Sequence, residues 1–262
     1  MNQPILSERE RLDEVNENLK LIQMRDGLTF GTDAYLLAAY MSETRVKNAV
    51  ELGGGTGIIS LLVANHKRAE HIVCAEVQED FCDLIRRNAA LNGLDRTISA
   101  LHTDVRDLSP ATLGFEADAV FTNPPYMKTD SGKRNESDAK YIARHEVHGG
   151  IYDFCRAADK LLKYGGKFFC VWRPDRLSDL MDAMRQNHLE PKRMTFVHAD
   201  IDATPSSVLV EAKKGAAPSL ILTPPLILHC GARGNAGQRP LSDDATDIYR
   251  DCSFSNFFKK KG

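Results

Sequence analysis

The stretch Asn48-Ala-Val-Glu-Leu-Gly-Gly-Gly-Thr-Gly57 decides the fold, because a short apolar segment runs directly into a glycine-rich loop. We expect residues 48–52 to form a buried strand and residues 58–65 to form the helix after the loop. A strand, a glycine-rich loop and a helix in this order open a nucleotide-binding βαβ unit. Glycine lets the backbone approach a ligand closely and adopt positive φ. The glycines that we expect to do so are Gly53, Gly55 and Gly57.

The spacing of these glycines also bears on the class of protein. The dinucleotide fingerprint is G-x-G-x-x-G, whose last glycine lies one residue further along than it does here. The spacing therefore disfavours a nicotinamide-dependent dehydrogenase.

Two acidic residues follow the loop at the ends of expected strands. Residues 71–76 are predicted to be the second strand, and Glu76 lies about 20 residues after the loop, where the acidic partner of a ribose diol is expected. Asp104 follows a third strand over residues 97–102, where it could accept a hydrogen bond from the exocyclic amine of an adenine. Each acid has a structural alternative, because carboxylates are also common at helix starts. Glu76 could open the next helix, and Asp104 could cap a helix that starts near Arg106.

The fourth expected strand, residues 117–122, leads into Asn123-Pro124-Pro125-Tyr126. Two successive prolines cannot continue a sheet ladder, so they form a stiff corner at the strand's carboxyl end, where open α/β sheets bind ligands. The Asn123 side-chain oxygen and the Pro124 carbonyl form a pair of acceptors, and Tyr126 offers an aromatic face. This set suits a flat substrate that carries an –NH2 group. The alternative is a proline-rich turn with a packing tyrosine.

A polar stretch with little periodicity follows, over residues 127–140, and is expected to be a loop beside the site. Three acidic residues dilute its positive charge, so a solvated loop and a phosphate-contacting loop are equal alternatives. The cations that could contact phosphates are Lys128, Lys133, Arg134 and Arg144.

Composition limits the possible partners. A formal net charge of −2 over 262 residues argues against wholesale binding to nucleic acid, so any RNA contact must be a local patch. The six cysteines include no Cys-x-x-Cys pair, which predicts reduced core residues without a disulfide framework or a metal site. The N-terminus is too charged for a signal peptide, and no apolar run reaches membrane length. We therefore expect a cytoplasmic protein without membrane contact.

Three segments are expected along the chain. Residues 1–45 form an annex: a strand over 19–24, a hairpin turn at Asp26-Gly27 with a return through residues 28–30, and a helix over 34–41. Thr32 or Asp33 would be the N-cap of that helix. Residues 46–214 form the catalytic domain, and its strands over 192–198 and 208–213 are expected to pair antiparallel at the sheet edge. Residues 215–262 form a C-terminal extension.

In this order, Glu51-Leu-Gly-Gly-Gly-Thr-Gly57, Glu76, Asp104 and Asn123-Pro-Pro-Tyr126 resemble class I S-adenosylmethionine-dependent methyltransferases of the small methyltransferase domain group. The resemblance spans most of residues 19–213. The bacterial tRNA(Val) adenine-37 N(6)-methyltransferases and their Gram-positive relatives resemble the chain more closely. That closer resemblance rests on Phe30-Gly-Thr-Asp33, Ala143-Arg-His-Glu146 and Thr223-Pro-Pro-Leu226.

The resemblance implies an α/β, Rossmann-like fold: a mostly parallel seven-stranded sheet with an antiparallel edge strand and helices on both faces. It implies S-adenosylmethionine as cofactor and the exocyclic amino group of an adenine in tRNA as substrate. The implied catalytic residues are Asn123, Pro124, Pro125 and Tyr126. The implied cofactor contacts are Thr32, Glu51, Gly53, Gly55, Gly57, Glu76, Asp104, Val105 and Asn123. The implied substrate contacts are Tyr126, Lys128, Lys133, Arg134 and Arg144.

Several alternatives stay open at this point. The same motif serves enzymes that methylate a glutamine amide of release factors, but those carry a helical N-terminal domain for which 45 residues are too few. Guanine amino groups in ribosomal RNA are another target, although the ring after the prolines is then more often Phe. A different class is a non-catalytic RNA-binding module that keeps the fold. We expect a monomer or a weak homodimer.

Overall fold

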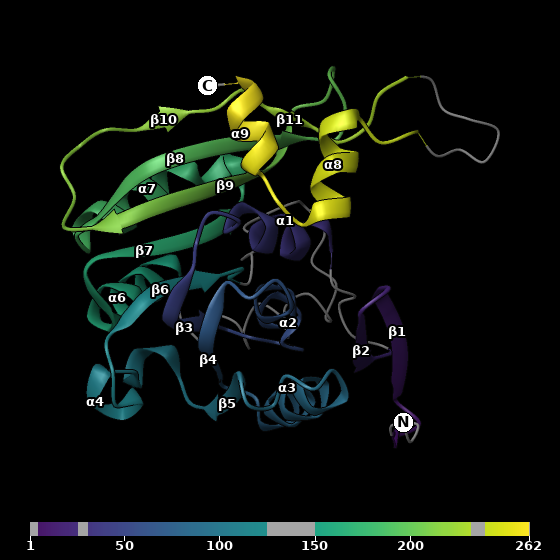
Figure 1. The fold of residues 1–262 in the computed structure, drawn as a ribbon. Coiled ribbons are helices and arrows are strands. Elements are labelled where there is room, and N and C mark those ends of the chain that lie inside the picture. The colour runs from purple at the N-terminus through teal and green to yellow at the C-terminus, as the bar shows by residue number, and fades with distance from the viewer. Residues whose placement is uncertain (1–4, 26–30, 125–149, 232–238, 262) are drawn as a thin grey trace, which may run out of the picture.

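The computed structural model describes residues 5–25, 31–124, 150–231 and 239–261, and their main feature is a twisted nine-stranded sheet (Figure 1). Its order is β10-β8-β9-β7-β6-β3-β4-β5, and β11 also pairs with β8. The strands are β3 (Val46–Leu52), β4 (Ala69–Glu76), β5 (Ile98–His102), β6 (Ala117–Thr122), β7 (Leu162–Trp172), β8 (Leu189–His198), β9 (Pro205–Lys214), β10 (Ile221–Leu222) and β11 (Leu226–Ile227). Seven of them form the expected sheet, and the two-residue strands β10 and β11 extend it.

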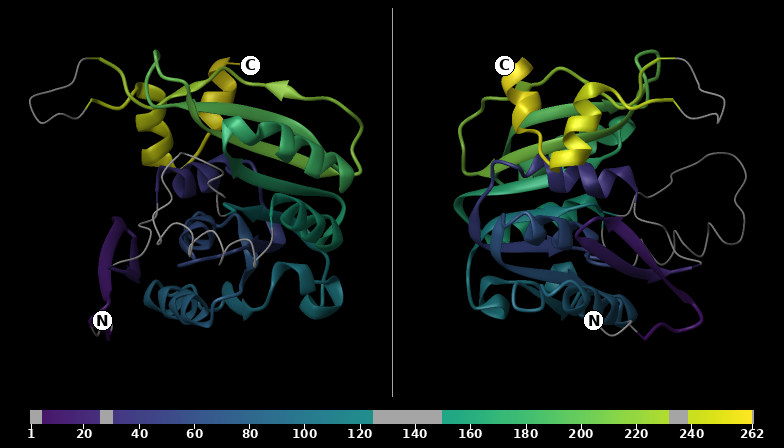
Figure 2. Two further views of the ribbon diagram at one scale, coloured as in Figure 1. Left: turned by 180° about the vertical axis from the view of Figure 1, so that it is seen from behind. Right: turned by 45° about the vertical axis from the view of Figure 1, so that its right-hand side comes forward.

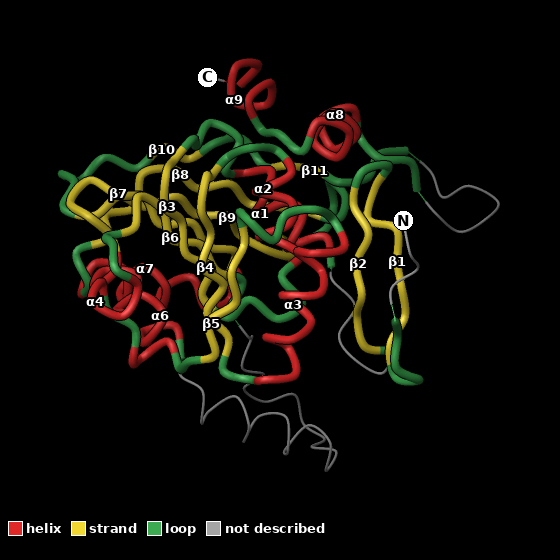
Figure 3. Tube along the Cα trace, turned by 60° about the horizontal axis from the view of Figure 1, so that its bottom comes forward, coloured by secondary structure: helices red, strands yellow, loops and turns green. Residues whose placement is uncertain are grey.

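Helices cover both faces of this sheet, as expected. They are α1 (Thr32–Tyr40), α2 (Ile58–Asn65), α3 (Glu79–Leu91), α4 (Pro110–Leu113), α6 (Ile151–Leu161), α7 (Leu177–Gln186), α8 (Asp243–Asp251) and α9 (Ser255–Lys261), with 3-10 turns η1 (Val105–Asp107) and η2 (Pro174–Arg176). Figure 3 shows α6 and α7 on one side of the sheet and α1, α2 and α3 on the other. No helix among the described residues is long and apolar enough to cross a membrane.

The burial pattern of β6 shows why the run Ala119-Val120-Phe121 is apolar at successive positions. Phe121 points into the core under α1 and α2, whereas Val120 points into the core under α6 and α7. Successive side chains of a strand alternate between the two faces, so a sheet covered on both faces buries neighbouring residues of a central strand on opposite sides. The short apolar run before Asn123 is therefore a central strand.

The chain reverses its direction across the sheet at β3. Strands β3 to β7 are all parallel. From β3 the strand order first extends to one side of the sheet, through β4 and β5, and then to the other side, through β6 and β7. The boundary between β3 and β6 is thus the topological switch point, and ligands of open α/β sheets bind at the carboxyl ends of the strands there. The glycine loop (residues 53–57) follows β3, and Asn123 follows β6, so both lie at this edge.

The antiparallel pairing of β8 with β9 is confirmed, but the antiparallel strand is not the outermost one. Strand β9 lies between β7 and β8 and is antiparallel to both. Pro191 of β8 sits where the register shifts, a position that tolerates a residue without an N–H. Strands β10 and β11 then pair in parallel with the outer side of β8.

The N-terminal region contains a strand that the sequence did not predict. Strand β2 (Leu19–Met24) is present, but it pairs antiparallel with the upstream strand β1 (Glu10–Asn16). The expected return through residues 28–30 lies outside the described residues. Helix α1 begins at Thr32, and its N-cap is Gly31, so the prediction that Thr32 or Asp33 caps it is wrong.

The C-terminal helices pack onto the same core as α1 and α2 (Figure 2). The buried ring of Phe254 meets that of Tyr40 edge-on, with centroids 5.2 Å apart. Helices α1 and α8 share one core with α2. The division of the chain at residues 45 and 214 stays a prediction. Five of the six cysteines are buried, as expected, whereas Cys230 is exposed.

Arg68 joins the end of helix α8, in the predicted C-terminal extension, to helix α1. It is 4 % exposed, and its guanidinium donates to the backbone carbonyls of Ala38, in α1, and Cys252, the C-cap of α8. Both carbonyls lie at helix C-termini, where the helix dipoles favour a cation.

Arg68→Met should lower the free energy of unfolding by about 3 kcal/mol, because the Ala38 and Cys252 carbonyls each lose a bond from a charged donor, which contributes about 1.5–3 kcal/mol, while the Ala38 carbonyl keeps the bond from the Met41 N–H at 3.2 Å. Urea denaturation measures this loss. Arg45→Met is the matched control, since the exposed Arg45 also donates to a backbone carbonyl, that of Lys67, at 3.0 Å. It should change stability by less than about 0.5 kcal/mol. Equal effects of the two substitutions would contradict this role.

Candidate active site

The glycine loop has the backbone conformation that its sequence predicts. Gly53, Gly55 and Gly57 have φ of +70°, +53° and +81°, in the region that L side chains rarely adopt. A Cβ added at Gly53 or Gly57 would meet Phe154 or Ile85, but one added at Gly55 would meet no atom within 4 Å. The loop therefore leaves open space at Gly55, which is where a ligand could approach its backbone.

The end of β4 holds this loop. The N–H groups of Gly53 and Gly54 donate to the Ala75 carbonyl at 2.9 and 3.2 Å, and the Gly55 N–H donates to Glu76 Oε2 at 2.9 Å. Glu76 Oε1 accepts from the Gln78 N–H at 3.0 Å, so the carboxylate also stabilises the start of α3. Glu76 thus lies beside the glycine loop and also at the start of the next helix, and its contact with a ribose stays a prediction.

Glu51 is buried behind the loop. Its Oε2 accepts hydrogen bonds from Ser60 N–H at 3.1 Å, from the Ser60 hydroxyl and from the Cys74 thiol at 3.3 Å. These bonds join the end of β3 to the first turn of α2 and to β4. Burial raises the pKa of Glu51 to about 7, although the hydrogen bonds from Ser60 and Cys74 partly oppose that shift. A contact of Glu51 with the ammonium of a bound amino acid stays a prediction.

Asp104 adopts the structural alternative. Its Oδ1 accepts from the Arg106 backbone N–H at 2.9 Å and so caps η1. The Arg106 guanidinium also bonds both carboxylate oxygens, at 2.9 and 2.5 Å. Val105, the next residue, is buried. An adenine amine would therefore share the Asp104 carboxylate with Arg106, and this contact stays a prediction.

Asn123 carries an acceptor without a donor. The preceding Thr122 hydroxyl donates to the Leu52 carbonyl at 2.8 Å, which joins the ends of β6 and β3. Asn123 Oδ1 is buried and has no hydrogen-bond partner among the described residues. A buried acceptor without a partner costs about 1–3 kcal/mol, so this atom marks a place for a donor from outside the described chain.

The other proposed contacts fall into two groups. Thr32 is exposed at the start of α1 and lines a cavity of about 350 Å³ together with Tyr35, Tyr249 and Asn16. The rings of Tyr35 and Tyr249 lie 5.2 Å apart. The remaining predicted residues lie outside the described ranges: Pro125, Tyr126, Lys128, Lys133, Arg134 and Arg144.

Comparison with known proteins gives the family. The model of the methyltransferase small domain matches residues 24–193, well over half of the chain. The chain belongs to the methyltransferase small domain family. It is 29% identical over 185 residues to the tRNA1(Val) (adenine(37)-N6)-methyltransferase of Parabacteroides distasonis, covering 69% of this chain and 75% of that one. The enzyme of the same name from Phocaeicola vulgatus is 29% identical over 189 residues, covering 72% and 78%.

Solved structures agree with this fold. A crystal structure from Agrobacterium tumefaciens, described as a predicted O-methyltransferase, superimposes with a TM-score of 0.67 and 22% identity over 85% of this chain and 97% of that one. The tRNA m1G37 methyltransferase of M. jannaschii superimposes with a TM-score of 0.53 and 16% identity, over 80% and 55%. At these identities the likeness shows the fold of a methyltransferase alone.

One residue that contacts the glycine loop of this methyltransferase was not predicted from the sequence. Asn88 of α3 is fully buried, and its Nδ2 donates to the Thr56 carbonyl of the glycine loop at 3.0 Å. The available signal was an amide between Ile85 and Ala89, on the apolar face of an amphipathic helix. A polar side chain at such a position needs buried partners.

The pKa of Glu51 predicts how the stability of the methyltransferase depends on pH. The folded protein binds this proton more tightly than the unfolded chain, whose carboxyl has the ordinary value of 4.5. Glu51 therefore contributes stability below about pH 4.5 and loses it as the pH rises through about 7. Glu51→Gln cannot ionise, so its free energy of unfolding relative to wild type should rise by about 3 kcal/mol as the pH increases from about 5 to about 8.

Urea denaturation of the ligand-free methyltransferase at a series of pH values measures this difference. Glu116→Gln, at an exposed position, controls for the change of charge and should follow the wild-type profile. A Glu51→Gln difference that does not vary with pH would contradict the prediction.

Proposed function

We propose that this methyltransferase transfers a methyl group from S-adenosylmethionine to the exocyclic amino group of an adenine in tRNA, next to the anticodon of tRNA(Val). The observation that carries the proposal is the buried Oδ1 of Asn123, which has no hydrogen-bond partner among the described residues and follows β6 at the β3–β6 switch point, where the glycine loop follows β3. The names of the bacterial relatives support the choice of adenine and of tRNA. The proposed enzyme acts in the cytoplasm as a monomer or a weak homodimer.

The residues at the switch point fit S-adenosylmethionine. Open space at Gly55 would admit the ligand against the loop backbone. The carboxylate of Glu76 retains lone pairs for ribose hydroxyls after its bonds to Gly55 and Gln78. Asp104 and the Val105 N–H would contact the adenine ring of the cofactor, and Thr32, Glu51, Gly53, Gly57 and Asn123 would complete the site. When bound, the cofactor supplies an electrophilic methyl group, which the substrate amine takes as the carbon–sulfur bond breaks.

Asn123 and Pro124 would prepare the amine for attack. The lone pair of an adenine amine is delocalised into the ring, which makes the nitrogen a poor nucleophile. If Asn123 Oδ1 and the Pro124 carbonyl accept hydrogen bonds from its two N–H groups, the nitrogen becomes pyramidal and its lone pair points at the methyl group. The nitrogen becomes acidic only after transfer, so the proton can leave to water and the site needs no strong general base.

The residues outside the described ranges would hold the RNA. Tyr126 would stack on the target base, which is worth about 1–3 kcal/mol. A base in a tRNA loop is already partly unpaired, and this lowers the cost of turning it into the site. The cations that follow Tyr126 in the sequence would contact phosphates. They are Lys128, Lys133, Arg134 and Arg144.

Cofactor binding is tested with Gly55→Val. The substitution fills the open space at the loop and should weaken binding of S-adenosylhomocysteine at least a hundredfold by calorimetry. Gly114→Val is the matched control, because Gly114 also has positive φ, +79°, and open space around its Cβ, but lies after α4. It should lose comparable stability and retain binding. Tight binding of NAD by the wild-type protein would overturn the assignment.

The chemical step is tested with Asn123→Ala. The variant should bind the cofactor within a few-fold of wild type but methylate tRNA about a hundredfold more slowly in a single turnover, the scale for one preorganised polar group. Mass spectrometry of the digested tRNA should find the wild-type product as N6-methyladenosine. Tyr126→Phe keeps the stacking face and should be mild, whereas Tyr126→Ala should not. Normal turnover by Asn123→Ala, or a product on guanine, would refute the proposal.

A further inference from the structure

Asn88 of α3 and Asn92, the C-cap of that helix, take the place of a second strand partner for β2, which pairs with β1. The Ile22 N–H donates to Asn88 Oδ1 at 2.7 Å, and Asn88 Nδ2 donates to the Ile22 carbonyl at 2.9 Å. Asn92 makes the same pair of bonds with Lys20, at 2.9 and 2.8 Å. The spacing fits, because residues four apart in a helix rise about 6 Å, and residues two apart in a strand rise about 6.7 Å. The N-terminal hairpin (β1 and β2) is thereby docked on α3.

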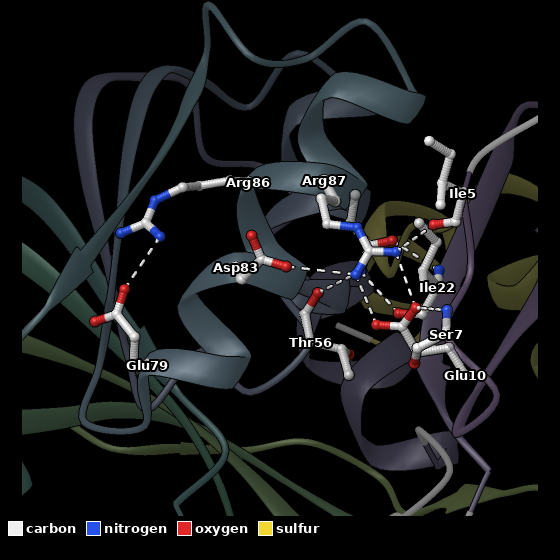
Figure 4. Close-up of polar contacts among 10 residues, drawn as sticks. Ile5, Ser7, Glu10, Ile22, Thr56, Glu79, Asp83, Arg86 and Arg87 are labelled. Atoms are coloured by element: carbon white, nitrogen blue, oxygen red, sulfur yellow. Dashed lines mark hydrogen bonds and ion pairs between the residues drawn. The ribbon is translucent and has the colours of Figure 1, made fainter. Parts of the chain in front are cut away.

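Only Asn88 extends this contact to the cofactor loop. Its Nδ2 uses one hydrogen for the Ile22 carbonyl and the other for the Thr56 carbonyl at 3.0 Å. The second hydrogen bond that Asn92 Nδ2 donates goes to the Asn88 carbonyl at 2.7 Å, within the same helix. A single buried amide therefore holds both the hairpin and the loop, and Figure 4 shows Ile22 and Thr56 among the residues that contact this part of α3.

The bond to Thr56 fixes the side of the loop that β4 does not reach. Ala75 and Glu76 hold Gly53, Gly54 and Gly55, whereas Thr56 lies at the far end, before Gly57 and α2. If Asn88 releases the Thr56 carbonyl, the far end loses a buried donor, and its peptide can turn. The loop would then present its open side at Gly55 less often.

A separate ion pair docks the other strand of the hairpin. Arg87 donates to both carboxylate oxygens of Glu10, in β1, at 2.6 and 2.9 Å, and to the Ile5 carbonyl at 2.7 Å (Figure 4). The hydrogen bonds from Arg87 lower the pKa of Glu10 to about 2. The hairpin therefore stays anchored when one asparagine is removed, so the two asparagines can be compared in a docked protein.

We propose that Asn88 is a positioning residue that couples docking of the N-terminal hairpin to the glycine loop, so that the docked hairpin raises the affinity of the loop for the cofactor. The inference rests on the proposed function for the identity of that cofactor. Coupling between two sites is reciprocal: a ligand that binds better to the docked state must stabilise docking by the same factor.

Hydrogen exchange in the wild-type protein tests the coupling without any substitution. Binding of S-adenosylhomocysteine should slow exchange of the Ile22 amide, which donates to Asn88, by about tenfold. Exchange at Ile22 that is unchanged in the saturated protein would overturn the coupling and leave the proposed function standing. A wild-type protein that binds no S-adenosylhomocysteine would overturn the proposed function and the coupling with it.

The matched variants Asn88→Ala and Asn92→Ala separate coupling from docking. Both remove two bonds to β2, but only Asn88→Ala also frees the Thr56 carbonyl. Asn88→Ala should weaken binding of S-adenosylhomocysteine about tenfold and abolish the slowing at Ile22. Asn92→Ala should bind within twofold of wild type and keep the slowing. Equal affinities of the two folded variants for S-adenosylhomocysteine would overturn the role of Asn88.

Discussion

The hydrogen bonds from the Gly53 and Gly54 amides to the Ala75 carbonyl are the constraint on which the site depends. They exist because β3 and β4 pair in parallel, with Leu52 opposite Ala75, so that the glycine loop leaves β3 directly beside the end of β4. The same register puts Glu76 one residue further on, within reach of the Gly55 amide. On the other side of β3, Glu51 pairs with Phe121 and Thr122 bonds the Leu52 carbonyl, which brings Asn123 to the loop. Sheet register thus assembles a site from segments far apart in sequence.

The parts that could be predicted from the sequence are those with local causes. A strand, a glycine-rich loop and a helix that follow one another leave one arrangement, and each later strand end carried its own polar residue. Strand β1 was missed because the signal of the turn between it and β2 was weak. The Asn16 side chain accepts from the Asn18 and Leu19 amides, both at 2.9 Å, and so closes a turn that contains no glycine. Strand β1 is charged and mostly half-buried, without the apolar alternation that marks a strand.

The roles of the acids could not be predicted, because one carboxylate can cap a backbone and bind a ligand. Glu51, Asp104 and Glu76 all accept hydrogen bonds from protein groups, and Glu76 accepts one of them from the glycine loop. Which of these happens depends on neighbours brought together by the fold, such as Ser60 and Arg106. Asn88 was missed for the same reason: its partners, Ile22 and Thr56, come from segments 66 and 32 residues away.

Contacts of the predicted C-terminal extension (residues 215–262) reach helix α1, whose first residue, Thr32, is a predicted cofactor contact. Thr223, in the Thr-Pro-Pro-Leu segment, lies 2.7 Å from the Thr195 hydroxyl of β8, which in turn meets the Tyr40 hydroxyl at 3.1 Å. Tyr40 ends α1, and its ring packs on Phe254 of the extension. Thr32 begins the same nine-residue helix, beside the Tyr35–Tyr249 cavity. Because a packed helix moves as one body, contacts that fix its last turn to β8 and to the extension also fix the position of Thr32 at its first.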